Sequence, residues 1–201
     1  VGSEMCIRDR YRLLSNLSFS LSTDGSINTM NADLNNFVQP TRYSWLTAFA
    51  GKYVNDWLTI SASALATIIN EDVKKGGSAG NHRKLTPYVS AAFKPFYNEE
   101  FRVRFFYKDI FRLASFNDLY YEEVGNTQLK PEKAKQYNIG LTYNKNVCSF
   151  LPYLSATIDA YYNKVTDKII AYPTKNLAVW SMKNLGQVDT VSYTHLTLPT
   201  T

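Results

Sequence analysis

The chain has 201 residues, a formal net charge of +5, 45% hydrophobic residues and 14% aromatic residues, including 15 tyrosines. No apolar run approaches the roughly 20 residues of a membrane-spanning helix, so any contact with a bilayer has to be made by strands. The basic residues alternate with apolar ones and do not form blocks. This pattern indicates the wet face of a sheet and argues against nucleic acid as a partner.

Cysteine and histidine do not form a motif in this sequence. Cys6 and Cys148 lie in different surroundings, and His82 and His195 are isolated. Their spacing indicates no disulfide framework, no zinc site and no set of nucleophile, base and acid. We therefore expect no metal, no cofactor and no catalytic residues, and the sequence does not predict an enzyme.

Alternation of apolar and polar residues begins at Tyr11 and predicts antiparallel strands. Between residues 101 and 111, for example, aromatic and aliphatic side chains alternate with arginine and lysine. The expected strands, about eight in number, cover residues 11–22, 42–54, 57–69, 85–97, 101–111, 132–144, 153–171 and 178–190.

The connections between these strands differ in length. Residues 24–41, 70–84 and 112–131 are long and polar, whereas 55–56 and 98–100 are tight turns. Long outer loops alternating with short turns are typical of transmembrane barrels. The strands, at about 11 to 13 residues, also exceed the roughly 9 to 11 that a tilted membrane strand requires. The fold class predicted from these patterns is all-β, an antiparallel up-and-down transmembrane β-barrel.

Two linked motifs resemble those of a known family. Residues 111–121 read Phe-Arg-Leu-Ala-Ser-Phe-Asn-Asp-Leu-Tyr-Tyr, and residues 125–132 read Gly-Asn-Thr-Gln-Leu-Lys-Pro-Glu. They resemble the barrel domain of TonB-dependent outer-membrane receptors, in which Arg-x-Pro-[Ser/Thr]-Phe-x-[Asp/Glu]-Leu-Tyr is followed by Gly-Asn-Pro-x-Leu-Lys-Pro-Glu. Ala114 and Thr127 replace the prolines of that family. The resemblance covers about residues 11 to 190.

This resemblance implies a fold and a function. The chain would supply about eight strands of a larger, 22-stranded barrel in the bacterial outer membrane, with a plug domain elsewhere in the receptor. The implied function is energised uptake of a large scarce nutrient such as siderophore-bound iron, haem or cobalamin. The implied partners are outer-membrane lipid, a metal-chelate or cobalamin-like ligand, and a TonB-type energy-coupling protein that engages a missing N-terminal region.

The motif loop supplies the candidate ligand-binding residues. They are Arg112, Asn117, Asp118, Tyr120 and Tyr121. Phe116, Leu119 and Tyr120 are too apolar for a free loop in water, so they are expected to pack against other parts of the barrel. Arg112 is expected to reach a carboxylate or a backbone carbonyl. Bracing of the loop is therefore favoured over direct contact with ligand.

The two ends differ from the rest of the chain. Residues 1–10 and 191–201 resemble translated sequencing-adapter sequence, so we expect them to be non-native ends without any element of the fold. Residues 11–190 are then the partial receptor barrel.

Two alternatives remain open. One is a small, complete eight-stranded outer-membrane barrel that binds or anchors, since eight strands can close around a filled interior. The other is a soluble β-sheet binding protein. That alternative requires polar outward faces, which the apolar faces of 11–22, 57–69 and 101–111 do not offer.

Overall fold

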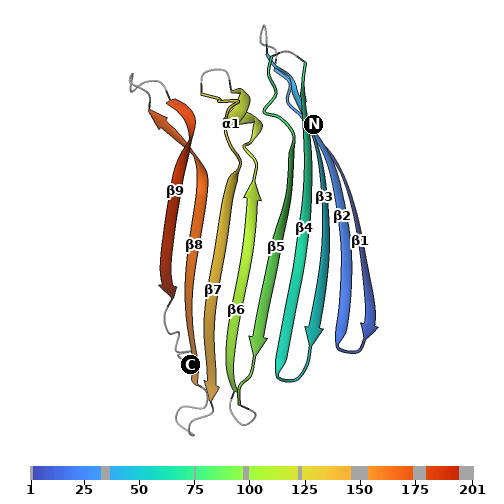
Figure 1. Ribbon diagram of the computed structural model, residues 1–201, viewed down its shortest axis with the longest axis vertical. Helices are drawn as coiled ribbons and strands as arrows, with labels where there is room; N and C mark the ends of the chain where they lie inside the picture. The colour runs from blue at the N-terminus through green and yellow to red at the C-terminus, as the bar shows by residue number, and fades with distance from the viewer. Residues whose placement is uncertain are drawn as a thin grey trace.

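The computed structural model describes residues 2–32, 37–74, 76–96, 100–121, 124–145, 154–173 and 180–194. They form one nine-stranded antiparallel sheet in which every strand pairs with its neighbours in sequence (Figure 1). The elements are β1 (Gly2–Leu14), β2 (Leu17–Thr29), β3 (Pro40–Val54), β4 (Leu58–Val73), β5 (His82–Phe93), β6 (Glu100–Arg112), α1 (Phe116–Tyr120), β7 (Glu132–Lys145), β8 (Leu154–Pro173) and β9 (Trp180–Thr194). Among these residues no helix is long and apolar enough to cross a membrane.

The connections divide between the two ends of the sheet. Figure 1 shows the C-terminal ends of β2, β4, β6 and β8 at one end of the sheet, which we call the loop end. The C-terminal ends of β1, β3, β5 and β7 lie at the other, the turn end (Figure 1). The prediction of an all-β, up-and-down sheet is confirmed. The alternation of long and short connections does not extend to β7–β9, since six residues separate β8 from β9 and eight separate β7 from β8.

The register gives the sheet two chemically different faces. Phe93, Val103, Leu141 and Ile158 lie opposite one another in a row across β5 to β8. Because successive side chains of a strand point to opposite faces, this row defines an outward, apolar face. The basic residues of β6, which are Arg102, Arg104 and Lys108, lie on the inward face, as the alternation predicts.

Large apolar side chains remain exposed over the outward face. Phe49 is 54% exposed, and Ile139 and Ile158 are each 53% exposed. A soluble monomer rarely exposes so much contiguous apolar surface. Two threonines on this face, Thr23 and Thr47, satisfy each other through a hydroxyl hydrogen bond of 2.7 Å. This face is suited to lipid and not to water.

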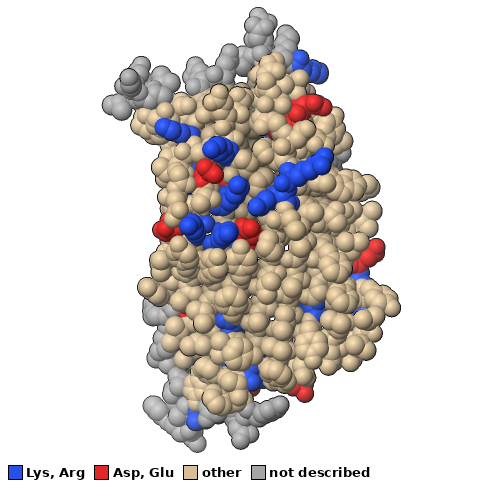
Figure 2. All heavy atoms as spheres, viewed as in Figure 1, with Lys and Arg blue, Asp and Glu red and all other residues tan. Residues whose placement is uncertain are grey.

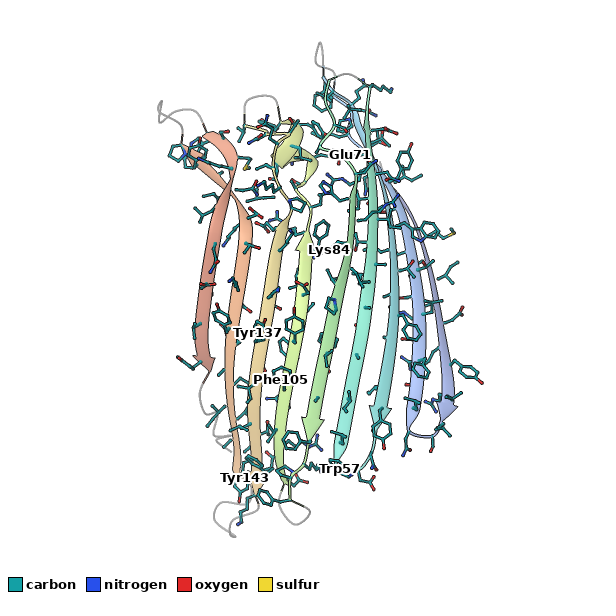
Figure 3. The ribbon with its side chains drawn as sticks, in the orientation of Figure 1. Trp57, Glu71, Lys84, Phe105, Tyr137 and Tyr143 are labelled. Atoms are coloured by element: carbon teal, nitrogen blue, oxygen red, sulfur yellow. The ribbon has the colours of Figure 1, made fainter. Side chains whose placement is uncertain are left out.

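Aromatic side chains border the apolar surface at two heights. The rings of Tyr107 and Tyr137 are 5.1 Å apart, and those of Tyr137 and Tyr162 are 6.1 Å apart. Near the turn end the rings of Phe101 and Tyr143 are 6.4 Å apart, and Trp57 lies at the same end (Figure 3). Such rows are typical of the two interfaces of a membrane barrel.

The sequence analysis placed one strand where the structure has a hairpin. Residues 11–22 were predicted as a single strand, but a two-residue turn at Ser15 and Asn16 divides them between β1 and β2. Tyr11 pairs with Phe19, so both lie on the outward face. A two-residue turn preserves the alternation on either side, which is why the pattern did not reveal it. The sheet therefore has nine strands instead of about eight.

The expectation that the ends contain no element of the fold is wrong. Residues 2–10 lie in β1 and pair with residues 20–28 of β2, and β9 continues to Thr194. Met5 and Ile7 continue the outward face of Tyr11, which is the physical reason for this pairing. Cys6 is exposed and carries a free thiol. Cys148 and His195 lie outside the described residues.

Candidate functional site: the docked α1 loop

The connection between β6 and β7 contains the short helix α1 and folds back onto the sheet. We call its described residues, 113–121 and 124–131, the α1 loop. Ser115 caps the helix: its hydroxyl accepts from the amide of Asp118 at 3.2 Å, and the Asp118 carboxylate accepts from the amide of Ser115 at 2.9 Å. This reciprocal capping box satisfies two backbone donors of the first turn. The capping box therefore stabilises α1, which has only five residues.

Apolar side chains of the α1 loop form the main buried cluster of the described residues. Its buried members are Ala114, Leu119, Tyr120, Leu129 and Ile169, and its half-buried neighbours are Val38, Val73, Ala79, Phe116 and Met182. These neighbours come from the loop-end connections and from β4 and β9. Packing of Phe116, Leu119 and Tyr120 is thus confirmed, and the loop contacts elements on both of its sides.

A polar cluster fastens the loop to β3 and β4, and we call Arg42, Glu71 and Tyr120 the Glu71 anchor. The hydroxyl of Tyr120 donates to the Glu71 carboxylate and accepts from the amide of Ala79 at 3.1 Å. Nε of Arg42 donates to Glu71 at 2.8 Å, and Nη2 of Arg42 donates to the carbonyl of Ala114 at 2.9 Å. Figure 3 shows Glu71 at the loop end, beside α1.

The environment of the Glu71 anchor is largely dry. Glu71 is 4% exposed and Tyr120 is 5% exposed. Burial first, and then the hydrogen bond to Glu71, raises the pKa of the Tyr120 phenol to about 12. The guanidinium of Arg42 also lies 4.6 Å from the centre of the Phe116 ring, a cation–π contact. The anchor therefore combines an ion pair, a neutral phenol and an aromatic face.

A second set of contacts fastens the loop to β9. The amide of Met182 donates to the carbonyl of Val124 at 3.0 Å, and Nδ2 of Asn126 donates to the carbonyl of Met182 at 3.1 Å. The side chain of Asn184 accepts from the amide of Lys130 and donates to its carbonyl, both at 2.8 Å. The loop is therefore anchored on the inward face at both sides, from β3 and β4 to β9.

Gly125 shows why the motif requires glycine. A Cβ atom at this position would lie 2.7 Å from both the carbonyl oxygen of Leu119 and the amide nitrogen of Tyr121. Both are backbone atoms that cannot move aside without unwinding α1. The amide of Gly125 also donates to the carbonyl of Tyr121 at 2.7 Å, which closes the turn after the helix.

The five predicted site residues have different positions. Tyr120 is buried in the Glu71 anchor. Arg112 binds Glu132 at 2.9 Å and lies 3.7 Å from Asp118, so it reaches carboxylates as expected. Asn117 and Tyr121 are exposed, Tyr121 by 56%. The structure therefore brings Arg112 and Asp118 together. Tyr120 instead binds Glu71, and Asn117 and Tyr121 face solvent.

Sequence analysis did not identify Arg42, Glu71 or Asn126. Arg42 and Glu71 are direct partners across β3 and β4. Opposite charges near the ends of two adjacent expected strands were the available signal, but using it requires the strand register. Asn126 belongs to the motif of residues 125–132, but the sequence analysis assigned it no role. Its role depends on Met182, 56 positions later in the chain.

Beneath the loop the inward face is hollowed. A cavity of about 740 Å³ is lined by residues of β3 to β6, including Leu46, Leu65 and Lys108, and by Leu113 of the α1 loop. Residues of the loop therefore form part of the wall of this cavity. Among the residues that the structure describes, no group of three or more His, Cys, Asp or Glu side chains could hold a metal ion.

A family model matches most of this chain, and a curated protein matches part of it. Residues 8–192 match the family model described as TonB dependent receptor-like, beta-barrel. A vitamin B12 transporter, BtuB of Vibrio vulnificus (strain YJ016), is 36% identical over 75 residues, which are 37% of this chain and 11% of that protein.

Solved structures match the fold at low identity. The copper transporter OprC matches with a TM-score of 0.73 and 12% identity over 96% of this chain and 33% of its own. The Serratia marcescens hemophore receptor HasR, solved as a double mutant with its hemophore HasA and heme, matches with a TM-score of 0.70 and 13% identity over 96% of this chain and 38% of its own. The chain thus spans 33% and 38% of the length of these two structures.

Proposed function

The chain belongs to the family of TonB-dependent receptor β-barrels, and we propose that it forms part of the barrel wall of a receptor for energised nutrient uptake. This is a family of receptors and transporters of the bacterial outer membrane, and not of enzymes. In the proposed receptor the loop end faces the cell exterior, the outward face contacts lipid, and a TonB-type partner acts through a region outside this chain.

The docked α1 loop is the observation that carries this proposal. It folds onto the inward face, where its side chains reach β4 through Glu71 and β8 through Ile169. Leu113 of the loop also lines the inward cavity. A loop held across the lumenal side of the sheet narrows the route along the inward face. This is what a receptor requires if it passes a bound nutrient inward without opening a permanent channel.

The nutrient belongs, in this proposal, to the class of siderophore-bound iron, haem and cobalamin. The support comes from the named relatives, among which are a vitamin B12 transporter and a hemophore receptor bound to its hemophore and heme. The inward face of β6 carries Arg102, Arg104 and Lys108. Arg104 is paired with Asp159, and Arg102 and Lys108 suit an anionic chelate. Which nutrient of this class the receptor binds depends on parts of the receptor outside this chain.

The small eight-stranded barrel is the weaker alternative. The sheet has nine strands, and in the described residues β1 pairs with β2 and β9 with β8, so the two edge strands do not close on each other. An open edge at each side is instead suited to a segment continued by further strands.

We further propose that residues 1–10 and 191–201 do not belong to the native receptor. The register supports this for the first segment, since it places Asp9 opposite Leu21, which in turn lies opposite Phe49 on the outward face. A carboxylate at that depth would contact hydrocarbon, where ionised side chains are costly. The sequence of the encoding gene tests this directly: a genomic reading frame that contains both segments would contradict it.

The proposal predicts that loosening the α1 loop lowers uptake more than ligand affinity. In the receptor that contains this chain, Tyr120→Ala and Arg112→Ala are expected to reduce uptake, while ligand affinity changes less than about tenfold, or 1.4 kcal/mol. Tyr121→Ala is the matched control, because this neighbouring tyrosine is exposed. A hundredfold loss of affinity, with the protease resistance of the loop unchanged, would make the loop a ligand contact and contradict the bracing role.

A further inference from the structure

Three lysines lie close together on the outward face near the loop end. Lys135 of β7 and Lys164 of β8 are direct cross-strand partners, and Lys133 occupies the next outward position of β7, diagonal to Lys164. Like charges directly opposite one another destabilise a sheet. We call these three residues the lysine patch. The Lys135–Lys164 contact is unfavourable unless anionic groups lie nearby.

Acidic side chains form no ion pair within 4.0 Å of the lysine patch among the described residues. In the described part of the chain, the ion pairs within 4.0 Å are Arg42–Glu71, Arg104–Asp159, Arg112–Asp118 and Arg112–Glu132, and none of them includes a patch lysine.

Two aspartates flank the lysine patch in the same row of the sheet. Asp109 lies opposite Lys135, and Asp189 lies opposite Lys164. Asp189 already accepts hydrogen bonds from the Tyr162 hydroxyl at 3.2 Å and from Nε2 of Gln187 at 2.8 Å. The three lysines and two aspartates therefore retain a net positive charge.

The lysine patch lies at one border of the apolar surface. Figure 2 shows charged side chains gathered over the upper part of β5 to β9, with few on the lower half of the same face. On β7 the outward positions between Lys135 and Lys145 hold only Tyr137, Ile139, Leu141 and Tyr143. Ten residues of strand extend about 33 Å, or about 25 Å along the normal at a tilt of about 40°, which equals the height of a barrel's apolar band.

The lysine patch thus lies at the depth of the outer-leaflet headgroups. Immediately below it is the aromatic row of Tyr107, Tyr137 and Tyr162, whose neighbouring rings are 5.1 and 6.1 Å apart. A ligand that fits both features has anionic groups above and acyl chains below. Lysine side chains at a membrane surface attract anionic lipid headgroups.

We propose that the lysine patch binds the phosphate groups of a phosphorylated lipid in the outer leaflet of the membrane. The inference rests on the proposed function only in so far as the sheet lies in the outer membrane. All three lysines lie on the outward face, so the ligand approaches Lys133, Lys135 and Lys164 from outside the barrel. The bound lipid would screen the Lys135–Lys164 repulsion and so stabilise β7 against β8.

The test uses the receptor that contains this chain, reconstituted in phosphatidylcholine nanodiscs. Binding of diphosphorylated lipid A is compared with that of fully dephosphorylated lipid A with the same acyl chains. The wild type is expected to prefer the phosphorylated form. Lys133→Gln/Lys135→Gln/Lys164→Gln is expected to lower its affinity about a hundredfold, at roughly fivefold for each lysine, and Asp109→Asn is expected to raise it.

The matched control is Lys52→Gln/Lys84→Gln/Lys108→Gln, which removes the same charge from the inward face. These three lysines lie opposite Ser61, Thr67 and Tyr88 respectively. The control variant is expected to bind the phosphorylated lipid as the wild type does. Folding of each variant is checked by its heat-modifiable electrophoretic mobility. If the patch triple variant does not fold, Lys135→Gln alone is used, with a roughly fivefold expected loss.

Three results would overturn the proposal: equal binding of the two lipids, unchanged binding by the patch variants, or equal losses in the patch and control variants. Displacement of the lipid by millimolar inorganic phosphate would identify a free-phosphate site and also overturn it. Nutrient uptake is measured separately, in cells that produce the wild-type receptor. Absence of uptake by the wild type, with intact lipid binding, would count against the proposed function and leave the lysine patch unaffected.

Discussion

Arg104 of β6 binds Asp159 of β8 across the whole width of β7, with Nη2 of the guanidinium 3.1 and 3.2 Å from the two carboxylate oxygens. Neighbouring strands are about 4.8 Å apart, so a contact that skips a strand requires a small residue between its partners. Gly140 is that residue, since it is the register partner of both. A Cβ atom on Gly140 would overlap Oδ1 of Asp159 and lie 3.0 Å from Nη2 of Arg104.

Gly140→Ala is therefore expected to displace the flexible ends of the Asp159 and Arg104 side chains and to destabilise the barrel by about 1 kcal/mol. The ion pair itself contributes little, because the Arg104 side chain is 46% exposed. Urea unfolding of the reconstituted receptor measures the effect. Gly186→Ala is the control, since nothing lies within 4 Å of its added Cβ, and it should change stability by about 0.5 kcal/mol or less. Equal stability of the two variants would contradict this account of Gly140.

Tyr120 should remain protonated at a pH at which exposed tyrosines ionise. Its pKa is raised from 10.0 to about 12, first by burial and then by the hydrogen bond to Glu71. The stabilisation from the neutral phenol is therefore complete below pH 10 and is lost as the pH rises through about 12. A tyrosinate absorbance titration of Tyr120→Phe should lack one transition near pH 12. A missing transition near pH 10 would show that Tyr120 is not buried in this anchor.

The two carboxylates that bind arginine near the α1 loop should differ in importance. Glu71→Gln leaves the Arg42 side chain, which is only 13% exposed, without a counter-charge, and should cost about 3 kcal/mol. Glu132→Gln affects Arg112, whose side chain is 54% exposed, and should cost about 1 kcal/mol or less. Hydrogen exchange of the backbone amides of the α1 loop measures the destabilisation caused by each substitution. Equal deprotection by the two substitutions would indicate that burial of Arg42 does not govern docking.

The sheet was predictable from sequence because one rule operates over the whole length of each strand. Alternation alone placed Val103 outward and Arg104 inward, and the structure agrees. The same rule failed at Ser15 and Asn16, since a two-residue turn leaves the alternation unbroken. It also gave no indication that Met5 and Ile7 would extend β1, because composition and resemblance had excluded that segment.

The site was predictable only in part. The motif identified the loop, and the apolar character of Leu119 and Tyr120 correctly predicted packing. Their partners could not be predicted, because Glu71 and Asn184 come from strands 49 and 54 positions away from the loop residues that they bind. Contacts of that separation are set by register and by sheet curvature, neither of which is expressed in the local sequence.

Charge substitution should affect the two faces differently. Val103→Arg places a guanidinium on the outward face at mid-depth, which should cost about 2–4 kcal/mol. Arg102→Val makes the opposite change at the neighbouring inward position and leaves the Arg104–Asp159 ion pair intact, so its effect should be small. Assembly into lipid vesicles, followed by heat-modifiable mobility, compares them. Equal impairment of assembly would contradict the assignment of the two faces.

The most direct test of the central claim, that this sheet is a membrane barrel wall with lipid on one face and the lumen on the other, is a spin-label scan along β7. Labels are placed singly at residues 136 to 139 and 141 to 143 of the reconstituted receptor, leaving out Gly140, where any side chain would clash. Collision with oxygen should peak at 137, 139, 141 and 143, and collision with a water-soluble nickel chelate at 136, 138 and 142. Accessibility without a period of two, or with the opposite phase, would contradict the account.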